Sequence, residues 1–306
     1  MSAGVQALLR IGRNTADLDR AVAFYRDVLG FRVDDASASP PAWTRVAGVE
    51  AMPSRCASLS LGAQHIELTE FPDAAPYPHD STSCDLWFQH CAIVVSDMDA
   101  AYRWVVAHGA IPITRGGPQL LPPSTGSVTA FKFRDPDGHP LELISFPEGI
   151  GDPVWQLPSG NGPTCGIDHS AISVGDVERS IGFYEQLGCH VAARGLNRGS
   201  EQQHLDDLTD VEVDVIALQP ATQTPHVELL GYRQPLGRAA TSMPVTAVAA
   251  DRLELSMRNL HAALDKLRRP GMDVVAHDAG SSASTSEIAV LRDPDGHWIV
   301  LAQRES

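Results

Sequence analysis

The sequence repeats one unit four times, and this repetition restricts the chain to folds assembled from copies of a single module. The segment from Asp17 to Tyr25 (DLDRAVAFY) resembles the segment from Asp176 to Tyr184 (DVERSIGFY), and both continue to a Leu-Gly pair. Two weaker copies begin at Asp97 and Asn259. The four starting positions are 80, 79 and 83 residues apart, so the copies fill the chain.

Each copy begins with the pattern of a capped amphipathic helix. Asp and Asn suit the N-cap, because their side-chain oxygen accepts a hydrogen bond from a backbone N–H of the first turn. Apolar residues follow at helical spacing, as at Leu18, Val22, Tyr25 and Leu29, and the pattern ends at or just before glycine. An extended segment precedes each helix and about three strand-like runs follow it, so each unit is predicted as strand, helix and three strands.

Two units carry the same turn before their last strand. The turn reads Asp-Pro-Asp-Gly-His at residues 135–139 and again at 293–297. Because Asp, Pro and Gly favour tight turns, we expect His139 and His297 to have structural roles. Linkers rich in proline and small residues separate the units, at Phe71–Ser83, Pro147–Thr164 and Gln234–Pro244.

The helix motif and the turn together are similar to those of the vicinal oxygen chelate superfamily. That superfamily includes glyoxalase I, extradiol dioxygenases, methylmalonyl-CoA epimerase and antibiotic-resistance proteins. The resemblance implies an α+β fold in which four tandem βαβββ modules form two half-barrel cups. It divides the chain into two regions of two modules each: 1–147 (modules 4–70 and 84–147) and 165–306 (modules 165–232 and 250–306).

In this superfamily the metal ligands come from the first and last strands of the modules, so the repeat locates the equivalent positions. The first-strand positions, seven residues before each cap, are Arg10, His90, His169 and Arg252. The last-strand positions are Glu67, Glu142, Glu228 and Val300. A guanidinium group cannot bind a metal, so the resemblance implies one complete set of metal ligands: His90, Glu142, His169 and Glu228. Two imidazoles and two carboxylates can hold a divalent metal ion, Ni, Co, Zn, Mn or Fe, with two positions left for substrate or water.

The order Arg, His, His, Arg bears on how the modules pair. Consecutive pairing would split the ligand set between the cups, whereas pairing module two with three, and one with four, collects it in one cup. The order therefore favours the nested arrangement, with modules two and three sharing the metal. In the other cup, Arg10 and Arg252 are expected to pair with Glu67 in place of a metal. His65 and His226 share a strand face with the last-strand glutamates and are expected at the rim.

Three functions remain open. The ligand set favours glyoxalase-like lyase, isomerase or epimerase chemistry, in which Glu228 or Glu142 is the catalytic base by resemblance. An extradiol-type ring-cleaving dioxygenase would use Fe(II) on His90, His169 and Glu228, although Glu142 would crowd the oxygen site. A non-catalytic small-molecule (antibiotic) binding protein would have an aromatic-lined cup without metal. Specificity is expected from four stretches without a recognisable pattern, Pro40–Ser54, Ile113–Ser127, Ala193–Asp210 and Ala276–Ser286.

The composition of the chain restricts the kinds of molecule that it is expected to bind. The chain has 23 Lys and Arg against 38 Asp and Glu, a net charge of −15, so a nucleic-acid partner is not expected. No apolar run approaches the ~18 residues of a membrane span, and no signal-peptide pattern is visible. Five cysteines without CxxC spacing argue against a disulfide framework. We expect a cytoplasmic monomer or homodimer that binds a small-molecule substrate.

Overall fold

The computed structural model describes residues 4–37, 40–52, 55–156, 164–222, 224–239, 243–267, 273–278 and 287–303. The first module comprises β1 (Val5–Thr15), α1 (Leu18–Ala23), the π-helical turn η1 (Phe24–Val28), β2 (Arg32–Ser37), α2 (Ala42–Val46), β3 (Cys56–Leu61) and β4 (Gln64–Glu70). The second comprises β5 (Gln89–Val95), α3 (Met98–Ala107), β6 (Ile111–Pro112), β7 (Gln119–Leu120), the 3-10 turn η2 (Pro123–Thr125), β8 (Thr129–Arg134) and β9 (Pro140–Ser145).

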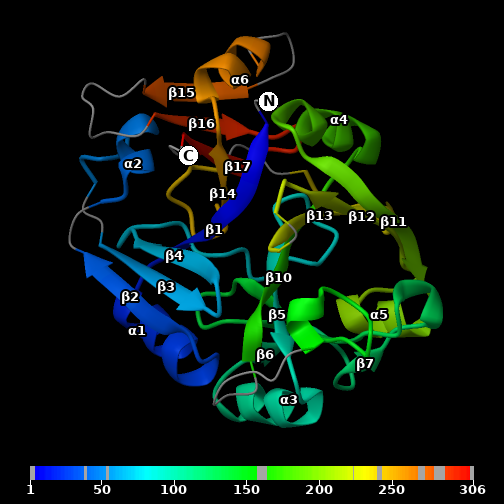
Figure 1. Ribbon diagram of the computed structural model, residues 1–306. Coiled ribbons are helices and arrows are strands. Elements are labelled where there is room, and N and C mark those ends of the chain that lie inside the picture. The colour runs from blue at the N-terminus through cyan, green and yellow to red at the C-terminus, as the bar shows by residue number, and fades with distance from the viewer. Residues whose placement is uncertain are drawn as a thin grey trace.

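A second 3-10 turn, η3 (Pro153–Gln156), lies in the linker to the third module. The third module comprises β10 (Thr164–Ser173), α4 (Val177–Leu187), β11 (His190–Arg198), α5 (Ser200–Asp206), β12 (Glu212–Gln219) and β13 (His226–Gln234). The fourth comprises β14 (Arg252–Met257), α6 (Leu260–Leu267), β15 (Asp273–Asp278), β16 (Ile288–Arg292) and β17 (Trp298–Gln303). Each module therefore keeps the predicted order of strand, helix and further strands (Figure 1).

The four predicted N-caps are present. The side-chain Oδ1 of Asp17, Asp97, Asp176 and Asn259 each accepts a hydrogen bond from the backbone N–H three residues on, at 2.9–3.1 Å. Two of the stretches expected to be irregular instead contain short helices, α2 and α5. Of the four stretches, residues 53–54 and 279–286 lie outside the described residues.

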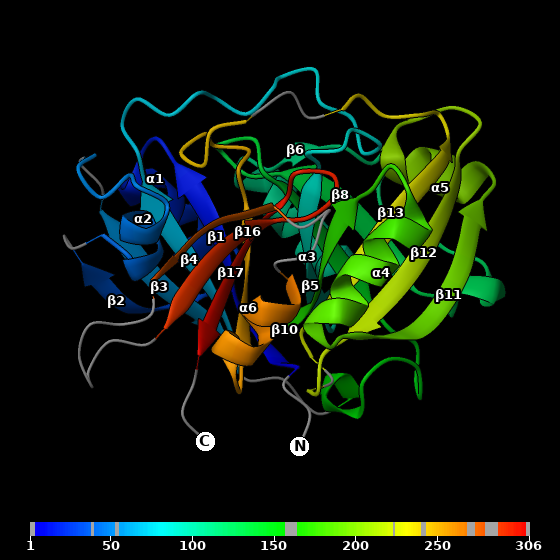
Figure 2. The ribbon, with the colours of Figure 1, turned by 90° about the horizontal axis from the view of Figure 1, so that it is seen from above.

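The strands form two sheets, and each sheet combines one module from the first half of the chain with one from the second half (Figures 1 and 2). One sheet has the order β15-β16-β17-β14-β1-β4-β3-β2 and combines modules one and four. The other has the order β11-β12-β13-β10-β5-β9-β8-β6, with β7 beside β8, and combines modules three and two. The central pairs, β1 with β14 and β5 with β10, are antiparallel. The strands thus follow the nested order, in which β5 and β10, the strands that carry His90 and His169, lie side by side.

Side chains point alternately to the two faces of a strand, and this alternation decides which residues face each cup. In β5, Cys91, Ile93 and Val95 belong to the main apolar core, which also contains helix residues of all four modules. Ala92 and Val94 point the other way and belong to a smaller apolar cluster on the concave face of the sheet. His90 shares their parity, so the strand pattern itself directs its side chain into the cup.

The two Asp-Pro-Asp-Gly-His turns connect the two sheets. In the first turn, Asp135 Oδ1 accepts hydrogen bonds from the backbone N–H groups of Asp137 and His139, both at 2.9 Å. His139 Nε2 lies 2.7 Å from the carbonyl oxygen of Asn14, and His297 Nε2 lies 2.9 Å from that of Ser173, each in the opposite sheet. Both histidines are buried, as their predicted structural roles require.

None of the five cysteines, all of which lie in the part of the chain that the structure describes, is in a disulfide. Among the helices that the structure describes, none combines the length and the apolar character needed to cross a bilayer.

Candidate metal centre

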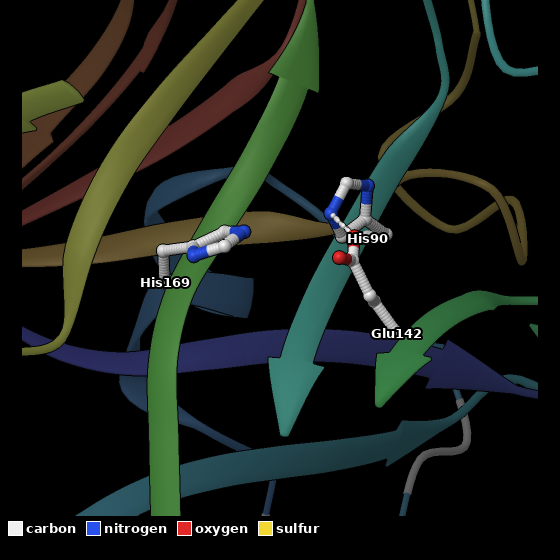
Figure 3. Close-up of side chains that lie close together, drawn as sticks. All are labelled: His90, Glu142 and His169. Atoms are coloured by element: carbon white, nitrogen blue, oxygen red, sulfur yellow. Dashed lines mark ion pairs between the residues drawn. The ribbon is translucent and has the colours of Figure 1, made fainter. Parts of the chain in front are cut away.

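The four predicted ligands lie on four neighbouring strands of one sheet: Glu228 on β13, His169 on β10, His90 on β5 and Glu142 on β9. All four line one cavity of ≈ 620 Å³ on the concave face of that sheet, which we call the metal cup. Figure 3 shows the side chains of His90, Glu142 and His169 pointing toward one another from their three strands. The fold therefore brings together residues that are up to 138 positions apart (228 − 90) in the chain.

Three of these residues form a tight group and the fourth stands at its edge. His90, Glu142 and His169 each offer a ligand atom, and these atoms all lie within 4.8 Å of one another. The His90 Nε2 atom is 2.8 Å from Glu142 Oε2, and the two imidazole centroids are 5.7 Å apart. Glu228 Oε1 is 3.9 Å from His169 Nε2, and its side chain is 18% exposed against 8% for Glu142.

A bulge in β10 adds a residue that counting along the repeat does not find. The pairing of β10 with β5 shifts between Ile167 and His169, so Asp168 and His169 both line the cavity. Asp168 Oδ2 lies 2.9 Å from His169 Nδ1, and Asp168 Oδ1 accepts a 2.7 Å hydrogen bond from Trp155 Nε1. A carboxylate on Nδ1 fixes the ring orientation and leaves the Nε2 lone pair for a metal. The acidic residue directly before the histidine is the signal that could have identified this contact.

The two rim histidines differ in their surroundings. His226 lines the metal cup, with its Nδ1 atom 4.0 Å from Asp168 Oδ2 and its ring centroid 5.3 Å from that of His169. His65 belongs to the other sheet, is 48% exposed and has its Nδ1 atom 3.6 Å from Asp34. Only His226 is thus close enough to the cluster to influence it.

Burial and charge set the protonation of the cluster. Burial lowers the pKa of His90 to about 4, against the opposing effect of Glu142. Burial alone would raise the pKa of Glu142, but the contact with His90 and the charges of Lys132 and His169 together outweigh burial and lower the pKa to about 2. For His169, the carboxylates of Glu228 and Asp168 outweigh burial and raise the pKa to about 9. A neutral His90 and an ionised Glu142 are the forms in which these side chains bind metals, whereas His169 would release its extra proton to the metal.

The residues fit a bound divalent metal. His169 Nε2 and both ring nitrogens of His90 are buried and lack a hydrogen-bond partner of good geometry among the residues described. A buried polar atom without a partner costs about 1–3 kcal/mol, so these nitrogens need a reason to be there. A cation between them would take up the Nε2 lone pairs, and two imidazoles with carboxylates are a donor set for Ni, Co, Zn, Mn or Fe.

The rest of the metal cup is mixed in polarity. Its apolar lining comes from Leu121, Val128, Ile144, Phe146, Leu205, Val215 and Leu230. The polar groups of the lining include Lys132, Asn197, Gln202 and Gln219. Among the described lining residues Phe146 is the one aromatic side chain apart from the histidines. An aromatic-lined cup, expected for a drug-binding protein, is therefore not what these residues form.

On the concave face of the other sheet, the second cup, side chains of this chain lie at the positions equivalent to the ligands. Glu67 Oε2 is 3.3 Å from Arg10 Nη1, and Glu67 Oε1 is 3.9 Å from Arg252 Nη2, so two guanidinium groups occupy the ligand positions as expected. Trp43, carried by α2, donates its Nε1–H to Glu67 Oε1 at 3.0 Å and packs under the Arg252 guanidinium, 3.9 Å from its ring centroid. Trp43 also packs in one apolar cluster with Val300. This cup has fixed positive charges and an apolar side chain where the metal cup has ligands.

Comparison with known proteins agrees with this architecture. A model of the Glyoxalase/Bleomycin resistance protein/Dioxygenase superfamily matches the chain twice, over residues 7–143 and 166–301. Lactoylglutathione lyase of Haemophilus influenzae is 32% identical over 153 residues, which are 48% of this chain and 98% of that protein. The 2-epi-5-epi-valiolone epimerase of Actinomyces sp. is 34% identical over 161 residues, 48% of this chain and 82% of that protein.

A similar fold is found in a solved structure that spans almost the whole chain. Glyoxalase I from Zea mays superposes with a TM-score of 0.65 at 20% sequence identity, over 97% of this chain and 92% of that one. The named relatives are enzymes, in agreement with the expectation that the chain is an enzyme. With two matches that together take in most of its length, the chain belongs to the Glyoxalase/Bleomycin resistance protein/Dioxygenase superfamily.

Proposed function

We propose that the chain is a divalent-metal-dependent lyase, isomerase or epimerase, acting on a small molecule that presents two adjacent oxygens. His90, Glu142, His169 and Glu228 would hold the metal, which is shared by modules two and three. The observation that carries the proposal is a cluster of buried imidazole nitrogens beside Glu142 in an open cavity, which lack a hydrogen bond of good geometry among the residues described. The relatives named as a lyase and an epimerase support the same chemistry.

The two glutamates suit different roles. Glu142 is the more deeply buried and lies against His90, so it serves as a fixed ligand. Glu228 is more exposed and stands 3.9 Å from His169, which leaves it freer to approach a substrate. We assign Glu228 as the base that removes a proton from the carbon next to a carbonyl group and returns it. A bound divalent cation supplies Lewis-acid stabilisation of negative charge on the substrate oxygen.

The surrounding residues support this division of labour. Asp168 holds the His169 ring in place, and Trp155 holds Asp168. The apolar lining, with Leu121 and Ile144, excludes water from the reacting atoms. The substrate therefore binds between a polar cluster that carries the chemistry and an apolar wall.

Ring-cleaving dioxygenase chemistry is the weaker candidate. A two-histidine, one-carboxylate iron site needs three open positions for catechol and oxygen. Here Glu142 lies within the cluster, 2.8 Å from His90, and offers a second carboxylate. The ligand set of this chain thus supports four protein ligands and two open positions.

A hydrogen-exchange experiment tests the proposal. The metal-loaded protein is incubated in D2O with S-lactoylglutathione and with 2-epi-5-epi-valiolone, the compounds named in its relatives, and carbon-bound deuterium is followed by NMR. We expect exchange in at least one compound and its loss in Glu228→Gln even at saturating metal, because an amide cannot act as the base. We expect Glu142→Gln to bind the metal more weakly than the parent. Exchange in neither compound, or an unchanged rate in Glu228→Gln, contradicts the proposal.

A further inference from the structure

A buried lysine stands in the metal cup beside one of the proposed ligands. Lys132 on β8 is paired directly with Glu142 on β9, so the two side chains project from the same face of the sheet. Lys132 lines the same cavity as His90 and Glu142, and its side chain is only 3% exposed. A charged side chain at such a position is costly to bury unless it has a partner or a task.

The partner of Lys132 comes from α5, 74 residues further along the chain. Asp206 Oδ1 accepts a 2.7 Å hydrogen bond from Lys132 Nζ, while Asp206 Oδ2 accepts from Gln202 Nε2 at 2.7 Å and from the Tyr232 hydroxyl at 3.0 Å. Asp206 is thereby held on three sides. An ammonium group has three N–H donors, and Asp206 is the side chain that takes one of them among the residues described.

The charge on Lys132 is kept by its surroundings. Burial would lower its pKa, but the carboxylates of Asp206, Glu142 and Glu228 outweigh burial and raise the pKa. The metal cup therefore contains a permanent cation in addition to its candidate metal ligands.

The other modules show that the fold does not require a charge at this position. The residues paired with the last-strand ligand positions are Ser58 opposite Glu67, Ala217 opposite Glu228, and Val290 opposite Val300. Val290 belongs to the same apolar cluster as Trp43 in the second cup. Because an apolar residue in a well-packed wall is as stable as a buried ion pair or more so, packing alone does not explain Lys132.

We propose that Lys132 is the anion-binding residue of the metal cup, and that its ammonium group, positioned by Asp206, donates a hydrogen bond to a negatively charged oxygen of the substrate. This inference rests on the proposed metal-dependent function. The ligand class is a small molecule with an anionic oxygen next to the two that approach the metal ligands, either a carboxylate or an enolate oxygen. Asp206 balances the charge of Lys132, so the subsite itself is neutral before the ligand arrives.

Two variants with opposite expectations test this assignment. Nickel-loaded parent protein, Lys132→Met and Asp206→Asn are titrated calorimetrically with oxalate, a carboxylate probe, and with acetohydroxamate, an enolate-like probe. Lys132→Met should weaken at least one probe by about 10- to 100-fold, since a hydrogen bond to a charged group is lost. Asp206→Asn, which keeps the ammonium and removes its counter-charge, should bind the same probe as tightly as the parent or more tightly.

The outcomes separate the possibilities. Weaker oxalate binding alone identifies a carboxylate subsite, and weaker acetohydroxamate binding alone identifies an enolate subsite. Equal weakening in both variants would mean that the Lys132–Asp206 pair only holds α5 in place, and this result would overturn the inference. Loss of nickel from Lys132→Met would overturn it too, as would failure of the nickel-loaded parent to bind either probe. A parent that holds no nickel contradicts the proposed function itself and the inference with it. If Lys132→Met does not fold, Lys132→Gln keeps a donor for Asp206 and takes its place.

Discussion

Asp168 offers a quantitative test of how the metal cup is organised. It is buried, and its carboxylate lies 2.9 Å from His169 Nδ1, so Asp168→Asn exchanges a charge-assisted hydrogen bond for a neutral one of similar shape. Hydrogen bonds to charged groups contribute about 1.5–3 kcal/mol and neutral ones about 1. The difference of roughly 0.5–2 kcal/mol predicts a metal dissociation constant about 2- to 30-fold higher in Asp168→Asn. This lies near the range found when a carboxylate behind a ligating histidine is removed.

The assay is competition between the protein and a coloured chelator for Zn²⁺ or Ni²⁺. Asp152→Asn is the matched control, because Asp152 also lines the cavity but its Oδ1 accepts from the backbone N–H of Val154 instead of from a histidine. The control removes the same charge from the cavity without touching the cluster. Equal losses in the two variants, or a change below about twofold in Asp168→Asn, would refute the reasoning.

Further predictions concern the second cup and the turns. Trp43→Ala should lower the free energy of unfolding by about 3–5 kcal/mol, because a buried indole is removed, while the metal content stays that of the parent. Urea unfolding combined with metal analysis checks this prediction, and loss of metal from the variant would contradict it. Burial would lower the pKa of His139, but the carboxylates of Asp251 and Asp135 outweigh burial and raise the pKa above its usual ~6.5. The charged form of His139 therefore stabilises the fold fully below pH ~6.5, and this stabilisation is lost as the pH rises through the raised pKa. The difference in unfolding free energy between the parent and His139→Gln should therefore shrink from pH 6 to pH 9 on chemical denaturation, and a gap that widened would contradict the sign.

Local signals explain what the sequence could predict. An N-cap, a helical spacing of apolar residues and a glycine stop act within a few residues, so the four caps and helices could be located by inspection. The repeat then carried the ligand positions onto equivalent strands. The distribution of His and Arg over these positions indicated which strands lie side by side, since β5 and β10 do pair.

What the sequence could not predict depends on geometry across strands. The bulge that turns Asp168 into the metal cup is a shift between two strands and leaves no trace in a repeat alignment. Helices α2 and α5 are only 5 and 7 residues long, too short for a periodic pattern. The Lys132–Asp206 pair joins two modules, and no local spacing connects its members.

Metal content tests the central claim most directly. Inductively coupled plasma mass spectrometry would compare the untagged parent with His90→Ala/His169→Ala and with Glu67→Ala, whose change falls in the second cup. The account predicts about one divalent metal ion per chain in the parent and in Glu67→Ala, and loss of the metal in the double variant. No metal in the parent after loading, or loss of metal in Glu67→Ala alone, would contradict it.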